Sequence, residues 1–596
     1  MNIESYLSQT ISVVVNQLFE LSTTPESIVL QKTKKEFEGD YTLVTFPFIK
    51  AAKATPEQTG QLIGDMLLKE NENIINFNVV KGFLNFSLAN TFWLNEFKEI
   101  VAQPNYGIKK ANSSGKQIML EYSSPNTNKP LHLGHIRNNL LGFSVANIIQ
   151  TQGHEVIKVN LINDRGIHIC KSMIAWKLFG NGETPESTHE KGDHLVGKYY
   201  VAFDKEYKKQ TAELEAQGLT KEEAEKKAPI MLQTQDMLLK WEANDSETIE
   251  LWKTMNGWVY KGFDVTYKKL GVTFDKLYYE SNTYLLGKEI VQEGLAKHIF
   301  YKKENGSVCI DLTNEGLDEK VVLRSDGTSV YITQDLGTAI ERAKEFPKLN
   351  QMIYTVGNEQ DYHFKVLFKC LEKLGYDWAK ECFHLSYGMV ELPEGKMKSR
   401  EGTVVDADDL IDGMVATAKE TTEELGKVEG FTTDALETLY ETIGMGALKY
   451  FILKVDPKKK MMFDPKESID FNGHTGPFIQ YAHARIKSIL RRFEKPTHEL
   501  IISNGIELHA KEKELIKGLY EFSIALEESA NSFNPAIVAN YVYELTKLFN
   551  QFYNECPVLK EENETVKEFR IKLIETTANI MKNGMKCLGI EVPERM

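Results

Sequence analysis

Apolar and polar positions change rhythm along the chain, and the first change comes near residue 110. Before it, a helical pattern is followed by two β-rich stretches, GDYTLVTFPFIKAA and VVKGFLNFSL, with the helical segment TPEQTGQLIGDMLLKE between them. The run from Lys110 to Gly115 is rich in loop formers and marks a boundary. We therefore predict a small α+β domain over residues 1–110.

A strand–helix–strand pattern begins at Lys116. QIMLEYSS is typical of a strand, LGHIRNNLLGFSVANIIQTQG of a helix with Ile136, Leu140 and Phe143 on one face, and EVIKVNLIND of a second strand. This βαβ order predicts a Rossmann-like parallel sheet, whose ligands bind at the carboxyl ends of the strands. We assign residues 111–402 to this α/β domain.

The rest of the chain is mainly helical in pattern. Charged residues without strand signals begin at about residue 180, and we expect a helical insertion at about 180–300. Asp326-Gly327 between two β-rich runs predicts a hairpin turn, followed by helix DLGTAIERAKEF and strand QMIYTVG. We expect a loop and helical connector over 403–465 and an all-α domain over 466–596.

Composition places the chain among multidomain globular proteins. Its 596 residues exceed what one hydrophobic core supports, and 42% hydrophobic with 26% charged residues is ordinary for such proteins. The net charge of −14 argues by itself against nucleic-acid binding. A local basic strip could still bind phosphates, although a solvated helix face is the simpler interpretation of such a run. One run consists of Arg485, Lys487, Arg491, Arg492 and Lys495.

Several classes of protein are not expected. The start of the chain lacks a secretory pattern, and no apolar stretch approaches the length of a membrane span. The six cysteines form no CxxC pair, so we expect reduced, buried thiols, no zinc site and a cytoplasmic location. They are Cys170, Cys309, Cys370, Cys382, Cys556 and Cys587.

The first motif with chemical meaning is His132-Leu-Gly134-His135, between strand QIMLEY and the following helix. A helix N-terminus offers free N–H groups and the positive end of the helix dipole, both of which suit phosphate. Gly134 lets a nucleotide approach the backbone. The alternative is a chance pair of histidines.

The second motif is a polar loop from Glu394 to Gly402 that contains Lys396, Met397, Lys398 and Ser399. Such a loop can fold over a triphosphate and stabilise the charge that develops on pyrophosphate as it leaves. The alternative is an ordinary basic surface turn.

Together and in this order, the motifs resemble the HIGH and KMSKS signatures of class I aminoacyl-tRNA synthetases. The run from Glu121 to His135 resembles the form found in arginyl-tRNA synthetases. The similarity extends from about residue 80 to the end, and more weakly over the N-terminal domain. Further stretches that carry it are 163–166, 331–335, 358–363, 473–485 and 588–596.

The resemblance implies roles for the substrate-binding residues. Glu121, Tyr331 and Asp335 would hold the guanidinium of arginine, and carboxylates with a phenolic oxygen suit a planar cation with five donors. Asp335 could instead be only the N-cap of helix DLGTAIERAKEF. The α-amino end of arginine would be bound by Ser124, Asn126 and Gln360.

The resemblance also implies an ATP site, with Mg²⁺ arriving on the ATP and no dedicated metal ligands. Ser399 stands where the KMSKS pattern has lysine, so either Lys398 or Lys129 replaces that charge, and we favour Lys129. The residues implied to act in catalysis are Lys129, His132, His135 and Lys396. The ATP-binding residues would be His132, Gly134, His135, His363, Lys396, Met397, Lys398 and Ser399.

For tRNA, the family implies an anticodon-binding domain at 466–596 and contacts from Phe83, Asn85 and Met596. An alternating strand would also explain the pattern around Phe83. Bases could stack on aromatic side chains of one C-terminal helix, although we expect most of these to be core. They are Tyr541, Tyr543, Phe549, Phe552 and Tyr553.

The function implied is that of an arginine–tRNA ligase that acts as a monomer on L-arginine, ATP and tRNA(Arg), binding tRNA before adenylation. Three alternatives stay open. A class I synthetase for another amino acid would lack the acidic pair Glu121 and Asp335. A small-molecule nucleotidylyltransferase would not need residues 466–596, and a non-catalytic tRNA-binding paralogue would tolerate loss of the phosphate-site residues.

Overall fold

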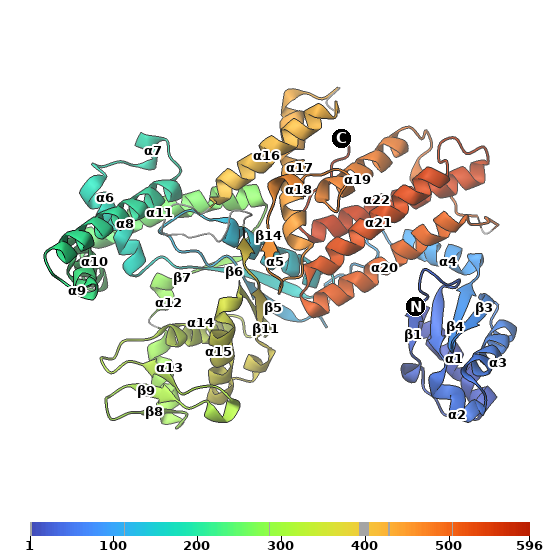
Figure 1. The fold of residues 1–596 in the computed structure, drawn as a ribbon, viewed down its shortest axis with the longest axis horizontal. Coiled ribbons are helices and arrows are strands. Elements are labelled where there is room, and N and C mark those ends of the chain that lie inside the picture. The colour runs from blue at the N-terminus through green and yellow to red at the C-terminus, as the bar shows by residue number, and fades with distance from the viewer. Residues whose placement is uncertain (1–2, 112–113, 285, 392–404, 427–429, 504) are drawn as a thin grey trace. The chain divides into compact units, whose positions relative to one another are not determined.

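The structure is a computed structural model that describes residues 3–111, 114–284, 286–391, 405–426, 430–503 and 505–596 (Figure 1). The chain forms two compact units. The first comprises Met1–Tyr106, Arg492–Glu521 and Lys547–Thr577, and the second comprises Gly107–Arg491, Phe522–Thr546 and Ala578–Met596.

The first unit contains the predicted α+β domain. Its sheet is antiparallel throughout, in the order β1-β2-β4-β3. Thr55 and Gln58 form a capping box at the start of α3, which explains why that helix begins at Pro56. The elements are α1 (Ile3–Phe19), β1 (Leu30–Lys32), β2 (Tyr41–Val44), α2 (Ile49–Ala52), α3 (Pro56–Glu70), β3 (Ile74–Val80), β4 (Phe83–Leu88) and α4 (Asn90–Val101).

C-terminal segments pack against this sheet within the first unit. Asp40, which is 3% exposed in its side chain, pairs with Lys513 at 3.2 Å and Lys517 at 2.6 Å. Phe97 of α4 packs edge-on against Phe569, with ring centroids 5.6 Å apart. The predicted domain 466–596 is therefore divided between the two units, because part of its apolar surface is buried against the N-terminal domain.

The second unit is built on the predicted parallel sheet, in the order β12-β11-β5-β6-β7. Helix α5 (Leu133–Gln150) makes the crossover from β5 to β6, begins at the predicted residue and ends about two residues before the predicted end. The βαβ prediction is confirmed. The strands are β5 (Gln117–Glu121), β6 (Glu155–Ile162), β7 (Lys276–Tyr279), β11 (Leu349–Gly357) and β12 (Phe383–Tyr387).

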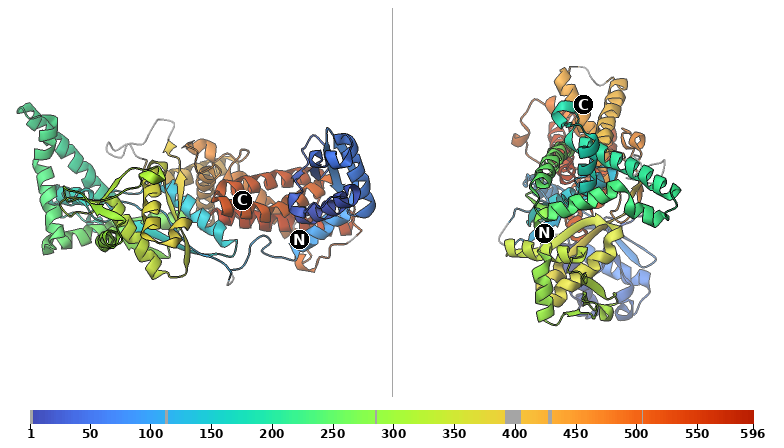
Figure 2. Two further views of the ribbon diagram at one scale, coloured as in Figure 1. Left: turned by 90° about the horizontal axis from the view of Figure 1, so that it is seen from below. Right: turned by 90° about the vertical axis from the view of Figure 1, so that its left-hand side faces the viewer.

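The helical insertion lies between β6 and β7, and its helices gather into one bundle (Figures 1 and 2). It ends at Leu270, and the chain is back in the parallel sheet at residues 276–279. The predicted end at about residue 300 is therefore too late, since β7 has only four residues and too little alternation to be recognised. The helices are α6 (Ile167–Phe179), α7 (Pro185–Thr188), α8 (Gly192–Ala216), α9 (Lys221–Lys227), α10 (Pro229–Glu242) and α11 (Ser246–Leu270).

A small antiparallel sheet, in the order β10-β9-β8, follows the insertion. The turn predicted at Asp326-Gly327 is present: Gly327 has a φ of +81°, and the Arg324 N–H donates to the Thr328 carbonyl at 2.9 Å. The prediction of a second hairpin strand after this turn is wrong, because a helix begins at Tyr331. The elements are α12 (Glu280–Thr283), α13 (Gly287–Ala296), β8 (Phe300–Lys302), β9 (Val308–Ile310), β10 (Lys320–Leu323) and α14 (Tyr331–Glu345).

The remaining elements are almost all helices, as predicted. A two-stranded parallel pair, β13 with β14, is the exception. The elements are α15 (Asp361–Leu374), β13 (Val390–Glu391), α16 (Ala407–Glu424), α17 (Thr433–Leu453), β14 (Met461–Met462), α18 (Pro465–Ser468), α19 (Gly476–Arg491), α20 (Ala510–Ser532), α21 (Pro535–Glu555) and α22 (Glu564–Cys587).

The core that supports the parallel sheet joins its strands to α14 and α15. Met119, Val159 and Met352 of the sheet belong to the same buried apolar cluster as Leu336 of α14 and Leu367 of α15. Burial of such side chains supplies the main driving force for folding. It also fixes α14 and α15 beside the carboxyl ends of the strands.

The cysteines and the lengths of the helices were both the subject of predictions. All six cysteines are free, five are buried, and Cys382 is partly exposed. Within the described ranges, every helix is too short or too polar to cross a membrane.

Helix α5 approaches β5 so closely that Gly142 leaves no room for a side chain. A Cβ there would lie 2.4 Å from Cβ of Tyr122, which is fully buried. We expect Gly142→Ala to lower the free energy of unfolding by about 1–3 kcal/mol through overpacking. Gly257→Ala in α11 meets open space and should be neutral or stabilising by about 0.5–1 kcal/mol. Urea unfolding followed by circular dichroism compares them, and equal stability of the two variants would contradict the close packing.

Candidate functional site

Several predicted site residues of the second unit follow the carboxyl ends of two neighbouring strands: Ser124 and Asn126 come after β5, and Gln360 comes after β11. After β5 the chain runs beside the segment that follows β6: Thr127 donates to the Asn163 carbonyl at 3.1 Å, and Asn163 donates to the Pro125 carbonyl at 2.9 Å. Asn126 pairs with Asn163 in a parallel bridge and is exposed. The edge of the sheet therefore carries two adjacent loops, as the Rossmann-like topology requires.

The loop after β5 is held in a strained conformation. Ser123 and Ser124 have φ values of +82° and +46°, in the left-handed region that side chains disfavour. Their N–H groups donate to Oδ1 of Asn138 at 2.6 Å and Oδ1 of Asn160 at 3.0 Å. The two buried asparagines thus fix the turn that presents Ser124. The sequence analysis did not identify either asparagine as a site residue. The only indication in the sequence is that each places a polar amide within a largely apolar helix or strand.

The carboxylate of Glu121 lies at the end of the central strand and already has protein partners. Its Oε2 is 2.5 Å from Nη2 of Arg342 in α14, and its Oε1 accepts from the Ser124 hydroxyl at 3.2 Å. Arg342 is 1% exposed and lies over the ring of Tyr278 at 4.7 Å. Burial lowers the pKa of Arg342, but Glu121 together with Tyr354 and Tyr278 outweighs burial, and the pKa is raised. The guanidinium stays charged.

Asp335 lies in the second turn of α14, because the helix begins at Tyr331. The alternative that Asp335 is the N-cap is therefore wrong. Its Oδ2 is 2.6 Å from Nε2 of His363 in α15. Tyr331 lies one helical turn earlier on the same side of α14 and is 78% exposed, and Gln360 is the residue just before α15. The structure brings Asp335 and His363 into contact, although the sequence assigned them to different substrates.

The two histidines of the first motif form a capping box at the start of α5, with His132 as the N-cap and His135 as the third helical residue. His132 Nδ1 accepts from the Gly134 N–H, and His135 Nδ1 accepts from the His132 N–H, both at 3.2 Å. Their ring centroids are 3.9 Å apart. Burial, with the Lys129 charge, lowers the pKa of His132 to about 4 and that of His135 well below its usual value. Both rings are therefore neutral at pH 7, and each keeps its proton on Nε2.

The second motif, with Lys396, Met397, Lys398 and Ser399, lies outside the described residues. The described chain resumes at Val405 and pairs at once with the first motif. Leu133 donates to the Val405 carbonyl at 3.2 Å, and Ala407 donates to the Leu131 carbonyl at 2.9 Å. These backbone hydrogen bonds form an antiparallel bridge between His132 and Asp406, which holds the backbone of His132 in place.

A cavity of about 230 Å³ lies beside this bridge. Burial lowers the pKa of Lys129 at its wall, and none of the carboxylates in the described ranges forms an ion pair with that ammonium. An anion is the natural ligand for a half-buried cation of this kind. The other polar residues of the lining are His132, His194, Lys198, Tyr200 and Asp406.

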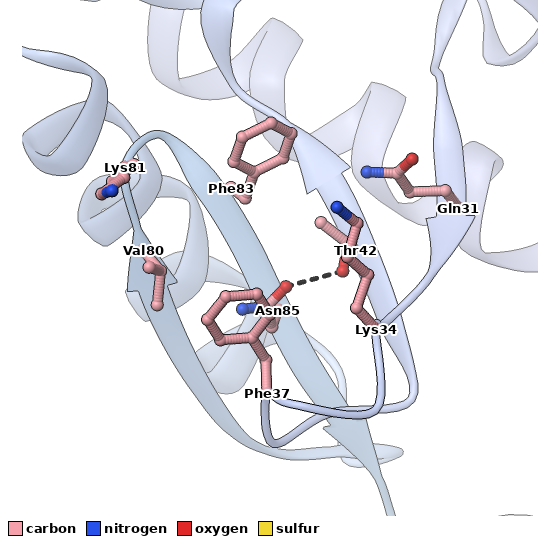
Figure 3. A pocket seen from close by; sticks show the side chains of 8 residues that line it. All are labelled: Gln31, Lys34, Phe37, Thr42, Val80, Lys81, Phe83 and Asn85. Atoms are coloured by element: carbon pink, nitrogen blue, oxygen red, sulfur yellow. Dashed lines mark hydrogen bonds between the residues drawn. The ribbon is translucent and has the colours of Figure 1, made fainter.

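The first unit has a cavity of its own, of about 320 Å³, lined by residues from all four strands of the N-terminal sheet (Figure 3). Phe83, 37% exposed, and Asn85 both line it, together with Lys34 and Lys81. Asn85 is buried and its Oδ1 accepts from the Thr42 hydroxyl at 2.6 Å. Residues 83–88 do form a strand, but its burial does not alternate regularly, because Leu84, Asn85 and Phe86 are all buried.

The other residues predicted to contact tRNA are less distinctive. Met596 is half-buried at the end of the second unit. Phe549 and Phe552 are fully buried, as expected for core residues, whereas Tyr553 is 37% exposed. Tyr543 stacks on His474, with ring centroids 3.9 Å apart.

Comparison with known families covers nearly the whole chain. Residues 96–464 match the catalytic domain of "tRNA synthetases class I (R)", residues 479–596 match the "DALR anticodon binding domain", and residues 2–88 match the "Arginyl tRNA synthetase N terminal domain".

Individual relatives agree with these matches. A protein of Bacteroides thetaiotaomicron named arginine–tRNA ligase is 56% identical over 598 residues, covering 100% of both chains. The solved arginyl-tRNA synthetase of Thermus thermophilus has the same fold, with a TM-score of 0.77 at 24% identity and complete coverage of both chains. That of Plasmodium falciparum has a TM-score of 0.75 at 19% identity, covering 100% of this chain and 99% of the other. The chain therefore belongs to the arginyl-tRNA synthetase family of class I tRNA synthetases.

Proposed function

We propose that the protein is an arginine–tRNA ligase. The observation that carries the proposal is the position of an acidic pair, Glu121 and Asp335, at the same sheet edge as the histidine N-cap of α5. The acidic pair suits a guanidinium, and the start of α5 with its histidines suits phosphates. A single site with both properties fits a reaction between arginine and ATP.

The proposed reaction has two steps. The carboxylate oxygen of arginine attacks the α-phosphorus of ATP, the bond to the β-phosphate breaks, and pyrophosphate leaves with the electron pair. A terminal ribose hydroxyl of tRNA then attacks the carbonyl carbon of arginyl-adenylate, and AMP leaves. Mg²⁺ enters as part of the ATP complex. Positioning and charge neutralisation are what both steps require of the protein.

The phosphates would be bound by hydrogen bonds from neutral rings. Because Nδ1 of His132 and of His135 accepts a backbone N–H, each Nε2–H is available to a phosphate oxygen. Gly134 keeps the start of α5 open to the nucleotide. Lys129 would supply positive charge opposite the signature loop, where Ser399 stands in place of lysine, with Lys396 reaching from that loop.

The arginine side chain would be bound by Asp335, Tyr331 and Glu121. Arg342 already neutralises much of the Glu121 charge, so Asp335 carries most of the attraction for the substrate cation. His363 contacts Asp335 and would connect the arginine site with the ATP site. Ser124, Asn126 and Gln360 would bind the α-amino group.

The tRNA would be bound outside the catalytic site. Phe83 offers an exposed ring for stacking, and Asn85, Lys34 and Lys81 offer polar contacts in the cavity of the first unit. The α-helical C-terminal region would bind the anticodon, and Met596 would contact the tRNA. We propose that tRNA(Arg) must bind before adenylation, and that the enzyme acts as a monomer in the cytoplasm.

Pyrophosphate exchange into ATP tests the proposal, with each amino acid supplied in turn and with or without bulk tRNA. We expect exchange with arginine alone and only when tRNA is present. Exchange with arginine but without tRNA would remove the required order and keep the ligase. Exchange with another amino acid, or with none, would favour one of the three alternatives over an arginine–tRNA ligase.

Asp335→Asn should weaken arginine binding specifically. Loss of a charge-assisted hydrogen bond costs about 1.5–3 kcal/mol, so the KM for arginine should rise by about 10- to 150-fold, with the KM for ATP nearly unchanged. Glu341→Gln, an exposed carboxyl on the same helix, is the matched control and should change neither constant. A larger rise in the KM for ATP would mean that Asp335 acts mainly through His363.

His132 should be neutral and protonated on Nε2 throughout the physiological range. A folded pKa of about 4 lies below the unfolded value of about 6.5, so the unfolded chain takes up the proton first as pH falls. The free energy of unfolding should therefore decline more steeply for wild type than for His132→Asn, which keeps an N-cap, between about pH 6.5 and pH 4. Urea unfolding across that range measures the free energy of unfolding, and NMR of ring-labelled histidine measures the protonation of His132. A His132 titration near pH 6.5 would refute the prediction that the ring stays neutral.

A further inference from the structure

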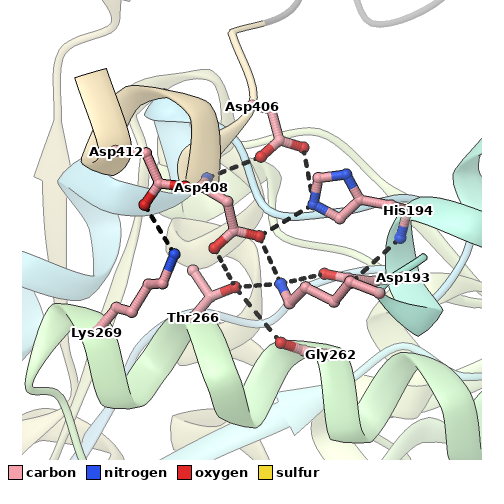
Figure 4. Close-up of polar contacts among 9 residues, drawn as sticks. Asp193, His194, Gly262, Thr266, Lys269, Asp406, Asp408 and Asp412 are labelled. Atoms are coloured by element: carbon pink, nitrogen blue, oxygen red, sulfur yellow. Dashed lines mark hydrogen bonds and ion pairs between the residues drawn. The ribbon is translucent and has the colours of Figure 1, made fainter. Parts of the chain in front are cut away.

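A buried polar cluster joins the helical insertion to the start of α16 (Figure 4). The Lys191 ammonium contacts Oδ2 of Asp408 at 2.6 Å, Oδ2 of Asp193 at 3.0 Å and the Thr266 hydroxyl at 2.6 Å. His194 Nε2 lies 3.0 Å from Oδ2 of Asp408. Lys191, Asp193 and His194 lie at the start of α8, Thr266 is in α11, and Asp408 is in α16.

The buried carboxylates of this cluster are paired with basic side chains of the protein itself. Asp193 and Thr266 are at most 1% exposed, and Asp408 is 8% exposed. Burial favours protonation of Asp408, but hydrogen bonds from His194 and Lys191 outweigh it and lower its pKa. The ligand atoms of Asp193, His194 and Asp408 lie within 4.8 Å of one another, as in a metal site. Lys191 contacts both carboxylates, so the protein supplies the cation itself.

Two glycines allow the close approach on which the cluster depends. A Cβ on Gly262 of α11 would lie 2.3 Å from Oδ1 of Asp193, and a Cβ on Gly192 would lie 2.3 Å from the Trp258 carbonyl oxygen. The start of α8 is therefore pressed directly against α11. The three elements have little freedom to separate without exposing buried charges.

Backbone hydrogen bonds connect the cluster to the proposed phosphate site. Asp406 Oδ1 accepts from the Asp408 N–H at 2.7 Å and caps α16. Residues 405–407 then pair with residues 131–133, which include His132. A shift of Asp408 would thus displace the strand segment that holds the N-cap histidine.

We propose that Lys191, Asp193 and Asp408 are positioning residues for adenylation, which fix His132 by clamping the first turn of α16 to the insertion helices. The inference rests on the proposed function. None of the three residues lines the cavity beside Lys129. They act through the bridge between residues 405–407 and 131–133, and displacements of about 1 Å at a catalytic group can cost about 100-fold in rate.

A neighbouring ion pair provides the control. Lys269 of α11 and Asp412 of α16 are 2.8 Å apart and join the same two helices, one turn of α16 further from the bridge. Both are exposed, at 39% and 68%. Such surface pairs contribute little, so the control removes the same type of contact without a buried charge imbalance.

The kinetic experiment compares Lys191→Met with Lys269→Met in arginine-dependent pyrophosphate exchange with tRNA present, well below each melting temperature. We expect the kcat of Lys191→Met to fall by about 10- to 100-fold, with the KM for arginine within about threefold, because only the phosphate site is displaced. Lys269→Met should stay within about twofold of wild type. Lys191→Arg, which retains the charge, should recover part of the loss. Equal effects of the two methionine variants would overturn the proposal.

A double-mutant cycle tests the route through His132. If the cluster acts through that residue, Lys191→Met should lower kcat by less than about threefold in a His132→Asn background. Multiplication of the two full effects would overturn the proposal, because independent damage is multiplicative.

Hydrogen exchange on the protein without substrates separates this inference from the proposed function. In Lys191→Met and Asp408→Asn, amides of residues 131–134 and 405–408 should lose protection, whereas Lys269→Met should keep wild-type protection. Unchanged protection in both cluster variants would overturn the clamp even for an active enzyme. An inactive wild type with the expected exchange pattern would instead refute the ligase and leave the clamp intact.

Discussion

The catalytic unit depends on a buried ion pair between the central strand and the helix that carries most of the predicted arginine pocket. Glu121 ends β5, Arg342 lies in the middle of α14, and each would be costly to bury alone. Their attraction therefore fixes α14 in rotation and along its axis relative to the sheet. That constraint determines the direction in which α14 presents Tyr331 and Asp335. It also determines where α14 approaches α15, at the contact between Asp335 and His363.

The same logic recurs in the turn after β5 and in the cluster beside α16. In each place, a conformation or charge that would be unfavourable alone is stabilised by buried polar partners from several elements. Asn138 and Asn160 hold the left-handed serines, and Lys191 holds two carboxylates. Rigid positioning of this kind is what a reaction without a side-chain nucleophile needs, since its rate depends on alignment and charge.

Elements with strong local periodicity could be predicted from the sequence, whereas those defined by tertiary contacts could not. Helix α5 and strands β5, β6 and β11 have continuous apolar patterns, and they were found almost at their observed bounds. Strand β7 is four residues long, and α14 begins inside a β-rich run because its packing on the sheet outweighs local preference. The division of residues 466–596 between two units depends on contacts such as Asp40 with Lys517, which have no local signal.

The site was predictable where a motif or resemblance named the residues, and not where partners came from distant parts of the chain. His132, Glu121 and Asp335 carry recognisable patterns. Arg342, Asn160 and Asp408 do not, because a buried polar residue resembles a surface one until the fold is known.

The neutral state of the two capping-box histidines has a consequence for product release in the proposed reaction. Imidazole N–H groups attract phosphate oxygens without adding formal charge, so His132 and His135 would bind pyrophosphate more weakly than two imidazolium rings would. An enzyme must not hold its product as tightly as the transition state that produced it. In the proposed reaction, the charge that arrives with Mg²⁺ and ATP leaves with the product, so the start of α5 would align the phosphates in every cycle without retaining the leaving group.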